Sequence, residues 1–236
     1  MRLTTPVYRL KRQAKLLSRE RGIALNEALD TIARKSGFRN WSHLAFAARS
    51  DPAVRILREL RPGEMLLLGA RPGHGKTLLA LELAMAAARA GRRSFFFTLE
   101  YTEADVRARL ASLGLAEAGD ETALLVDTSD DICAGHVVTR LREEPRPAFA
   151  VIDYLQLLDQ QRSKPDLSGQ LATLGAYARD SGAIIVVLSQ IDRGFERADR
   201  RMPALADVRL PNAADLTLFA RTCFLHEGEL ELDRVA

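Results

Sequence analysis

A glycine-rich turn between an apolar run and an apolar helical stretch constrains this chain more than any other feature. The run Leu66–Gly69 precedes the turn, and Lys76-Thr77 open the helical stretch. Glycines let backbone N–H groups face inward, and the helix adds its positive N-terminal end. A lysine there reaches the β- and γ-phosphates, and a threonine hydroxyl holds Mg²⁺. The pattern predicts a nucleotide-binding phosphate loop made of Ala70, Arg71, Pro72, Gly73, His74, Gly75, Lys76, Thr77 and Leu78.

The composition sets the size and the class of the protein. With 236 residues, 47% of them hydrophobic, the chain is long enough to bury one full core and a small second one. Cys133 and Cys223 are far apart and lack a CxxC pattern, so neither a metal site nor a disulfide framework is predicted. No apolar run approaches the roughly 18 residues of a membrane span. We therefore expect a soluble, cytoplasmic protein without a membrane partner.

Residues 1–52 are predicted to form a separate basic module of three short helices, at residues 7–20, 25–35 and 41–49. Residues 2–21 carry seven lysines and arginines against Glu20 alone. Such a charge favours an acidic partner such as DNA, or a solvated face. Phe38 and Trp41 fit either a docking surface or a small packed core. The sequence leaves these alternatives open.

Residues 53–236 alternate between strand and helix patterns, which predicts an α/β domain with a doubly wound, mostly parallel sheet. Continuous apolar runs such as Ile184–Leu188 are typical of strands buried on both faces. Ligands bind at the carboxyl ends of such strands. We expect strands at 65–69, 94–99, 123–127, 148–153, 184–189, 216–225 and 230–232, and helices at 76–90, 103–113, 132–143 and 167–179.

Three polar side chains stand at the predicted carboxyl ends of these strands. Asp153 ends one apolar run, as does the aspartate that helps to hold Mg²⁺ in phosphate-loop NTPases. Glu100 follows another run, and a carboxylate there can take a proton from attacking water. Gln190 has an amide that donates and accepts, and is predicted to report on the γ-phosphate. The alternative for each is an ordinary polar strand end.

Two polar loops follow these strands. The arginine segment, residues 191–201, and the loop at residues 159–165 are both cationic enough to track a nucleic-acid backbone. An ordinary solvated loop is the alternative, because acidic residues interrupt the first of them. The cations predicted to contact single-stranded DNA are Arg162, Lys164, Arg193, Arg197, Arg200 and Arg201.

In this order, the motifs resemble the RecA-like motor domain of DnaB-type replicative helicases. They are Ala70-Arg71-Pro72 with Gly75-Lys76-Thr77, Thr98-Leu99-Glu100, Ile152-Asp153-Tyr154-Leu155-Gln156 and Leu188-Ser189-Gln190. Ala70 replaces the usual first glycine of phosphate loops, as it often does in this family. The resemblance implies a RecA-like P-loop NTPase fold and an ATPase that binds ATP and Mg²⁺ and acts on single-stranded DNA. It also implies that Lys76 and Thr77 bind the nucleotide and Mg²⁺, Asp153 supports the metal, Glu100 activates water and Gln190 senses the γ-phosphate.

The resemblance further implies a homo-oligomeric ring, possibly a hexamer, in which a neighbouring subunit supplies an arginine to the ATP site. Arg234 and Arg221 are the candidates for this arginine. The basic module takes the place of the family's N-terminal helical collar and is expected to dock DNA or a protein partner. The main alternative is a KaiC-like regulatory or assembly ATPase without unwinding activity.

Overall fold

The structure is a computed structural model that describes residues 7–42, 44, 52–115, 124–145, 147–153, 155, 165–197, 200–210, 212 and 214–235. The chain divides into two compact units, Met1–Arg55 and Ile56–Ala236. The predicted boundary at residue 52 precedes this division, at the first residue of a helix, α4 (Pro52–Glu59), that we did not predict. Proline suits the first position of a helix, because the N–H that it lacks has no partner there.

The first unit contains α1 (Val7–Arg21) and α2 (Leu25–Lys35), packed around a small apolar core. Leu10 and Ala14 of α1 and Ala28 and Ile32 of α2 belong to this core, and so does Phe38. Phe38 therefore contributes to packing rather than to a docking surface. The third predicted helix lies largely outside the described residues.

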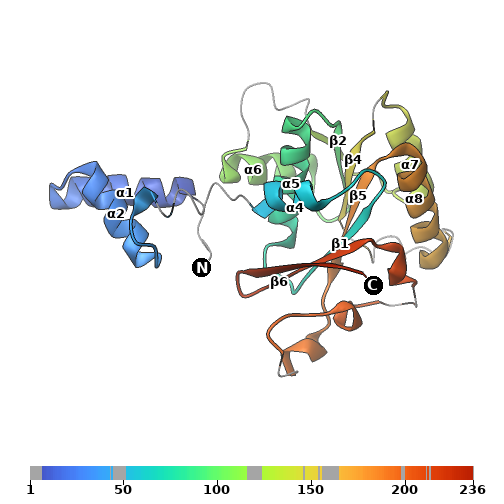
Figure 1. The fold of residues 1–236 in the computed structure, drawn as a ribbon. Coiled ribbons are helices and arrows are strands. Elements are labelled where there is room, and N and C mark those ends of the chain that lie inside the picture. Colours follow the sequence, from blue (N-terminus) through green and yellow to red (C-terminus); the bar gives the residue numbers. More distant parts are fainter. Residues whose placement is uncertain are drawn as a thin grey trace. The chain divides into compact units, whose positions relative to one another are not determined.

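The second unit contains a seven-stranded sheet in the order β3-β2-β4-β5-β1-β6-β7. All neighbouring strands are parallel except β6 and β7, which form an antiparallel hairpin. Figure 1 shows β1, β5 and β4 in the middle of the sheet. The strands are β1 (Met65–Ala70), β2 (Ser94–Thr98), β3 (Leu124–Asp127), β4 (Phe149–Asp153), β5 (Ile184–Gln190), β6 (Arg221–His226) and β7 (Glu229–Arg234).

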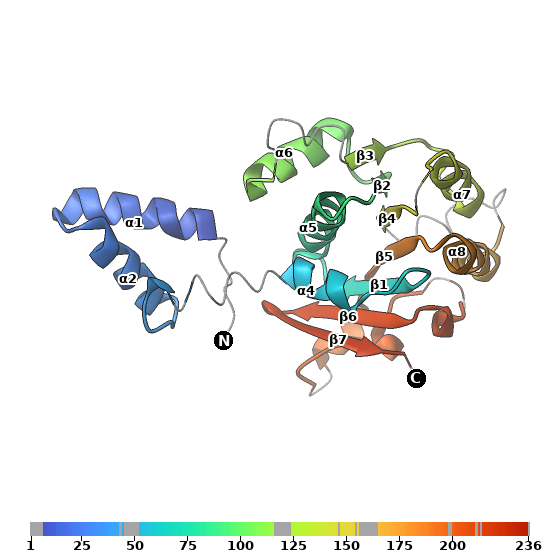
Figure 2. The same cartoon turned by 45° about the horizontal axis from the view of Figure 1, so that its top comes forward.

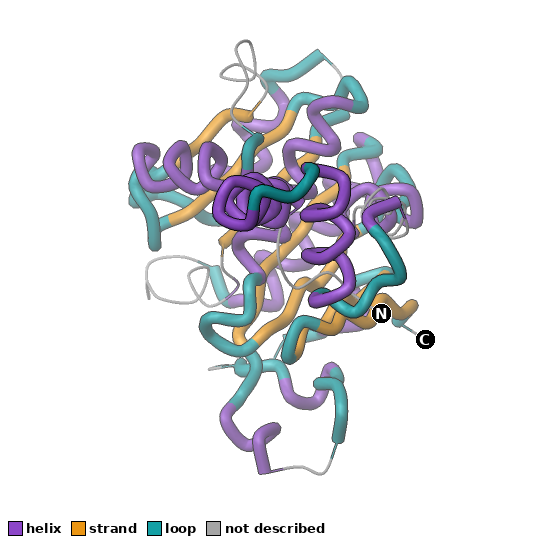
Figure 3. Tube along the Cα trace, turned by 90° about the vertical axis from the view of Figure 1, so that its left-hand side faces the viewer, coloured by secondary structure: helices purple, strands orange, loops and turns teal. Residues whose placement is uncertain are grey.

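Helices cover both faces of this sheet, as the continuous apolar strands predict. Helices α5 (Lys76–Arg89) and α6 (Glu103–Leu113) lie on one face, and α7 (Ala134–Arg142) and α8 (Leu167–Ser181) lie on the other (Figure 2). Figure 3 shows the strands side by side, with helices on both sides of them. The mostly parallel, doubly wound α/β fold is thus confirmed.

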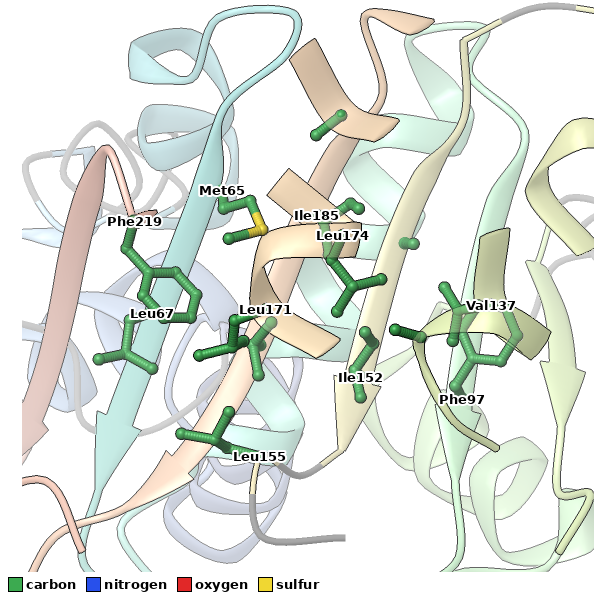
Figure 4. Packing of buried hydrophobic residues seen from close by; sticks show 14 of the residues in the cluster. Met65, Leu67, Phe97, Val137, Ile152, Leu155, Leu171, Leu174, Ile185 and Phe219 are labelled. Carbon is green, nitrogen blue, oxygen red and sulfur yellow. The ribbon is translucent and has the colours of Figure 1, made fainter. Parts of the chain in front are cut away.

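The core beneath α7 and α8 is formed by alternate residues of the strands. Leu67, Ile152 and Ile185 point toward this face and pack with Leu171 and Leu174 of α8 (Figure 4). Their neighbours along the strands face α5, so every residue of β1 and β4 is buried, and every residue of β5 before Gln190. This packing makes the central strands a rigid support for the loops at their carboxyl ends.

Several element limits differ from the prediction. The strand predicted at 216–225 begins only at Arg221, because Leu216–Leu218 form a short 3₁₀ helix, η5, capped by Asp215. The Asp215 carboxylate accepts the Thr217 N–H at 2.9 Å, and such local bonds compete with strand formation. Helix α7 begins at Ala134, two residues later than predicted, with Cys133 as its N-cap. Within the described residues, the helices are all too short or too polar to cross a membrane.

Candidate nucleotide-binding site

The phosphate loop follows β1 and ends where α5 begins at Lys76. Gly73 and Gly75 have φ values of 81° and 90°, which favour glycine because a Cβ is strained there. A Cβ built on either residue would meet no atom within 4 Å, so the space above both glycines is open. The loop therefore has the backbone conformation and the free volume that a phosphate group needs.

A third glycine, Gly69, sits at the end of β1 for a different reason. A Cβ on Gly69 would lie 2.7 Å from two ring carbons of Phe224 and 3.1 Å from Cδ1 of Ile191. The neighbouring side chains thus approach the backbone closely where β1 turns into the loop. This packing fixes the direction in which the loop leaves the sheet.

Lys76, Thr77 and Asp153 converge below the loop. Lys76 Nζ donates to Asp153 Oδ1 at 3.3 Å, and Thr77 Oγ1 donates to Asp153 Oδ2 at 3.1 Å. All three side chains are buried. Burial raises the pKa of Asp153, and the charge of Lys76 and the bond from Thr77 oppose this shift. Burial therefore destabilises the ionised Asp153 carboxylate, and its contacts with Lys76 and Thr77 offset part of this cost. The sequence assigned these two residues to the phosphates and the metal.

Glu100 lies beside this group. Its Oε2 is 3.9 Å from Lys76 Nζ, and its N–H donates to Thr98 Oγ1 at 3.1 Å. Thr98 is paired with Asp153 in the sheet, so β2 and β4 end side by side. Burial and the charge of Asp153 raise the pKa of Glu100, while Lys76 lowers it. The result is a carboxylate with increased proton affinity at the mouth of the site.

Gln190 ends β5 at the position paired with Ala70 in β1. Its carbonyl accepts the N–H of Arg209 at 2.8 Å, and its side chain is partly exposed. The amide is thus at the same edge of the sheet as the phosphate loop, directly before the arginine segment. The strand ends therefore bring Asp153 and Glu100 close to Lys76, and they place Gln190 at the same edge of the sheet.

The residues present fit Mg²⁺ and a nucleotide. Asp153 and Thr77 offer two oxygen ligands side by side, and Mg²⁺ commonly uses one or two protein oxygens together with phosphate oxygens and water. The described residues contain no group of three or more histidines, cysteines or carboxylates that would hold a metal ion without such help. Thr77 and Asp153 would therefore hold Mg²⁺ together with phosphate oxygens and water.

The predicted DNA-contacting cations have different environments. Arg162 and Lys164 lie outside the described residues. Arg193 is exposed at the start of a short 3₁₀ helix, η3 (Arg193–Arg197). Arg200 bonds Asp207 at 2.6 Å, and Arg201 Nε donates to Glu229 at 2.7 Å. These last two arginines already have carboxylate partners within the chain, which partly neutralise their charge.

The candidates for an arginine donated to a neighbouring subunit also differ. Arg221 is buried, with its guanidinium 3.5 Å from Glu64 and 3.6 Å from Glu59, and these contacts do not leave it free to reach another subunit. Arg234 is exposed and paired with Arg221 across the β6–β7 hairpin. Arg221 is aligned with Leu66 at the start of β1, so Arg234 lies at the edge of the sheet opposite its own phosphate loop. Only Arg234 retains the accessibility that this role requires.

Sequence reasoning missed the contacts that the loop makes with the arginine segment and with the β6–β7 hairpin. The ring of His74 stacks on the ring of His226, with centroids 5.3 Å apart and planes 4° from parallel. Arg71 forms an ion pair with Glu196. Each pair joins residues more than a hundred positions apart, and no local pattern in the sequence signals such a contact.

Comparison with known proteins agrees with the arrangement of these motifs. The family model described as "DnaB-like helicase C terminal domain" matches residues 54–118 and 116–221. The replicative DNA helicase DnaB of Leifsonia xyli subsp. xyli is 28% identical over 181 residues, covering 64% of this chain and 40% of that protein. The DNA repair protein RadA of Brucella abortus is 28% identical over 146 residues, covering 59% of this chain and 31% of that protein.

The fold also has solved counterparts. A DnaB-like replicative helicase, solved in a study of its interactions with primase, superimposes with a TM-score of 0.58 at 17% identity, covering 74% of this chain and 55% of that chain. This likeness confirms the RecA-like fold. The chain spans only about two fifths of the length of the curated helicases it matches, at 40% and 43%. Because the family model spans well over half of the chain, this protein belongs to the DnaB-like helicase C-terminal domain family.

Proposed function

We propose that this chain is the ATP-hydrolysing motor of a DnaB-type helicase or translocase that acts on single-stranded DNA. One observation carries the proposal: Lys76, Thr77, Asp153 and Glu100 gather at adjoining strand ends beside an open phosphate loop. Family membership supports it, because the matching relatives include replicative helicases. We take ATP and Mg²⁺ as the nucleotide and the metal.

The side chains have distinct tasks in this mechanism. Lys76 holds the β- and γ-phosphates, and the loop N–H groups orient them for in-line attack. Mg²⁺, when bound, neutralises charge on the phosphate oxygens, and Thr77 and Asp153 are the residues that would hold it. Glu100 orients the attacking water and takes its proton, a task that its raised pKa favours. Gln190 lies where its amide can respond to the γ-phosphate and pass the change to the arginine segment.

The arrangement of the strand ends supports action on single-stranded DNA. The arginine segment begins directly after Gln190, and Arg193 is exposed there. Cations on such a segment bind a phosphate backbone regardless of sequence. A homo-oligomeric ring would let Arg234 of one subunit reach the nucleotide of the next, where an arginine in trans accelerates phosphoryl transfer by about 10³- to 10⁵-fold in related systems.

ATP turnover measured with and without single-stranded DNA, over a range of protein concentrations, tests this function. We expect turnover to increase when a single-stranded oligonucleotide is added at a fixed protein concentration. We also expect the specific activity to rise with protein concentration, because the ring completes each site. A strand-displacement assay on a tailed duplex then tests unwinding. Turnover that depends on protein concentration but never on DNA would instead favour a KaiC-like assembly ATPase.

The basic module has a candidate function of its own, in docking nucleic acid. Lys11, Lys15 and Arg19 recur every four residues on α1 and are all exposed, whereas Leu10 and Ala14 of the same helix are buried. Side chains four positions apart share one helix face. This face therefore carries a line of cations suited to a phosphate backbone. A protein partner with an acidic surface is the alternative, and unchanged DNA affinity in the test below would favour it.

Replacement of Lys11, Lys15 and Arg19 by glutamine should weaken binding of the full chain to single-stranded DNA. The slope of log affinity against log salt should fall by about 2, since each phosphate contact contributes about 0.7 for single strands. The matched control removes three exposed arginines from the other unit, Arg58, Arg89 and Arg179, with the same loss of charge. Equal loss of DNA affinity in both triple variants would mean that the net charge of the chain, and not this face of α1, determines DNA binding.

A further inference from the structure

An ion pair ties the phosphate loop to the arginine segment. Arg71, the second residue of the loop, has Nε and Nη2 each 2.8 Å from Oε1 of Glu196. Its Nη1 donates to the carbonyl of Ile191 at 3.0 Å. One guanidinium therefore binds the first residue of the arginine segment and a carboxylate within η3. The Arg71 side chain is only 14% exposed, whereas that of Glu196 is 57% exposed, so the loop supplies the anchored partner.

Aromatic contacts provide a second link between the same parts. His74 of the phosphate loop stacks on His226, and the buried Phe195 meets His226 edge-on with centroids 5.0 Å apart. The Nδ1 atom of His74 also accepts the Glu227 N–H at 3.2 Å. The loop therefore contacts the hairpin turn, and the hairpin contacts the arginine segment. The ion pair does not act alone in holding this region together.

The first half of the arginine segment is internally braced. Asp192 Oδ1 accepts the Gly194 N–H at 2.7 Å, and the Asp192 carbonyl accepts the Phe195 N–H at 3.3 Å. The Ile191 N–H donates to Ala70 at 3.1 Å, directly at the end of β1. Residues 191–196 are thus a braced turn attached to the phosphate loop at both ends. A change in the mobility of the phosphate loop should therefore change the mobility of residues 191–196 together.

We propose that Glu196 is a positioning residue that couples nucleotide occupancy of the phosphate loop to the order of the arginine segment. Phosphate bound in the loop reduces the freedom of Arg71, so that holding Glu196 costs less conformational entropy. Arg193 and its neighbours are then presented to DNA in a fixed geometry. The DNA part of this inference rests on the proposed function. The coupling is reciprocal, so DNA must raise nucleotide affinity by the same factor.

Hydrogen exchange of residues 191–197 in the full chain tests the coupling without DNA. Exchange is measured with and without Mg²⁺ and a non-hydrolysable ATP analogue, in the wild type and in Glu196→Gln. Nucleotide should slow exchange of these amides in the wild type. The slowing should shrink by about two- to fivefold in Glu196→Gln, the range for an ion pair with one well-exposed partner. Identical slowing in both proteins, or none in the wild type, would overturn the inference.

Glu229→Gln is the matched control. Glu229 accepts from Arg201 at 2.7 Å, so its loss also removes one carboxylate paired with an arginine of the same segment. The paired arginine is not part of the phosphate loop. The nucleotide-dependent slowing should therefore persist in this variant. Its disappearance there would show that local charge, rather than the Arg71 contact, controls the segment.

The DNA arm measures the factor by which the ATP analogue raises affinity for an oligothymidylate. Glu196→Gln should reduce this factor, while Glu229→Gln should leave it as in the wild type. Both substitutions raise DNA affinity without nucleotide, because both remove a negative charge. Failure of the proposed function is seen separately, as a wild-type chain that binds the analogue but not DNA. In that case the exchange experiment still decides the coupling.

Discussion

Replacement of Lys76 by alanine is expected to reduce ATP turnover by at least about 10²- to 10³-fold, the cost of removing one preorganised charge-stabilising donor. Lys76 is the first residue of α5 and donates to Asp153 at 3.3 Å from a buried position. Its loss removes the cation that we propose binds the phosphates, and Asp153 then keeps the bond from Thr77 but loses the one from Lys76. Phosphate release and nucleotide binding are measured together, because both should fall.

The stability of this variant needs its own measurement. Breaking a buried ion pair can cost about 3–5 kcal/mol, so loss of activity has to be separated from unfolding. Arg89→Ala is the matched control, since Arg89 is an exposed cation at the opposite end of the same helix. Circular dichroism at the assay temperature identifies any unfolded fraction. Normal turnover in folded Lys76→Ala would overturn the assignment of the phosphate loop.

Replacement of Glu100 by glutamine is expected to reduce turnover by about 10²- to 10⁴-fold while nucleotide binding persists. Glutamine has the same shape and keeps the backbone bond from residue 100 to Thr98, but it cannot accept a proton from water. Glu103→Gln is the control, because Glu103 is an exposed carboxylate three residues later that pairs with Arg107. Turnover near the wild-type level in Glu100→Gln would place the proton acceptor elsewhere.

The raised pKa of Glu100 predicts two pH effects with opposite sense. A base acts when deprotonated, so wild-type turnover should fall as the pH drops through this pKa, and Glu100→Gln should lack that limb. For stability, a carboxyl whose folded pKa lies above its ordinary value contributes most when protonated, at low pH. This contribution is lost as the pH rises through the folded pKa.

At neutral pH the ionised Glu100 therefore opposes the folded state. Glu100→Gln should raise the free energy of unfolding of the nucleotide-free chain at neutral pH, and therefore its Tm. The gain should be no more than about 1 kcal/mol, because solvent screens the partly exposed side chain. Differential scanning calorimetry at neutral and acidic pH measures this effect. A lower Tm at neutral pH would mean that Glu100 stabilises the fold through Lys76 more than it repels Asp153.

Local patterns predicted the elements that build the site. The run before Ala70, the glycines of the loop and the helix after Lys76 follow from residues within a few positions of one another. For this reason β1, the loop and α5 form as the sequence predicts. The same reasoning was weaker at Leu216–Leu218, where two hydrogen bonds from Thr217 to the Asp215 carboxylate favour a 3₁₀ turn over a strand. Short-range competition of this kind is not visible in an apolar pattern.

The sequence also predicted that these polar residues lie at the strand ends, but it did not predict the distances between their side chains. Parallel strands predict that Asp153, Glu100 and Gln190 share one edge of the sheet. Which of them lie together depends on the strand order, which sets β4 between β2 and β5. The 3.9 Å approach of Glu100 to Lys76 follows from that order and from the turn after β2. The roles of these residues remain proposals that the variants above test.

By itself, the sequence determined the phosphate loop, the motif order and the alternation of strands and helices, because these depend on short-range spacing and hydrophobic period. Only the tertiary structure decided that Arg71 pairs with Glu196 and that His74 stacks on His226. It also decided that Arg221 forms ion pairs with Glu59 and Glu64. These contacts join segments far apart in the chain. They form because strand order and packing bring the segments together, and no local sequence pattern specifies a contact between residues so far apart.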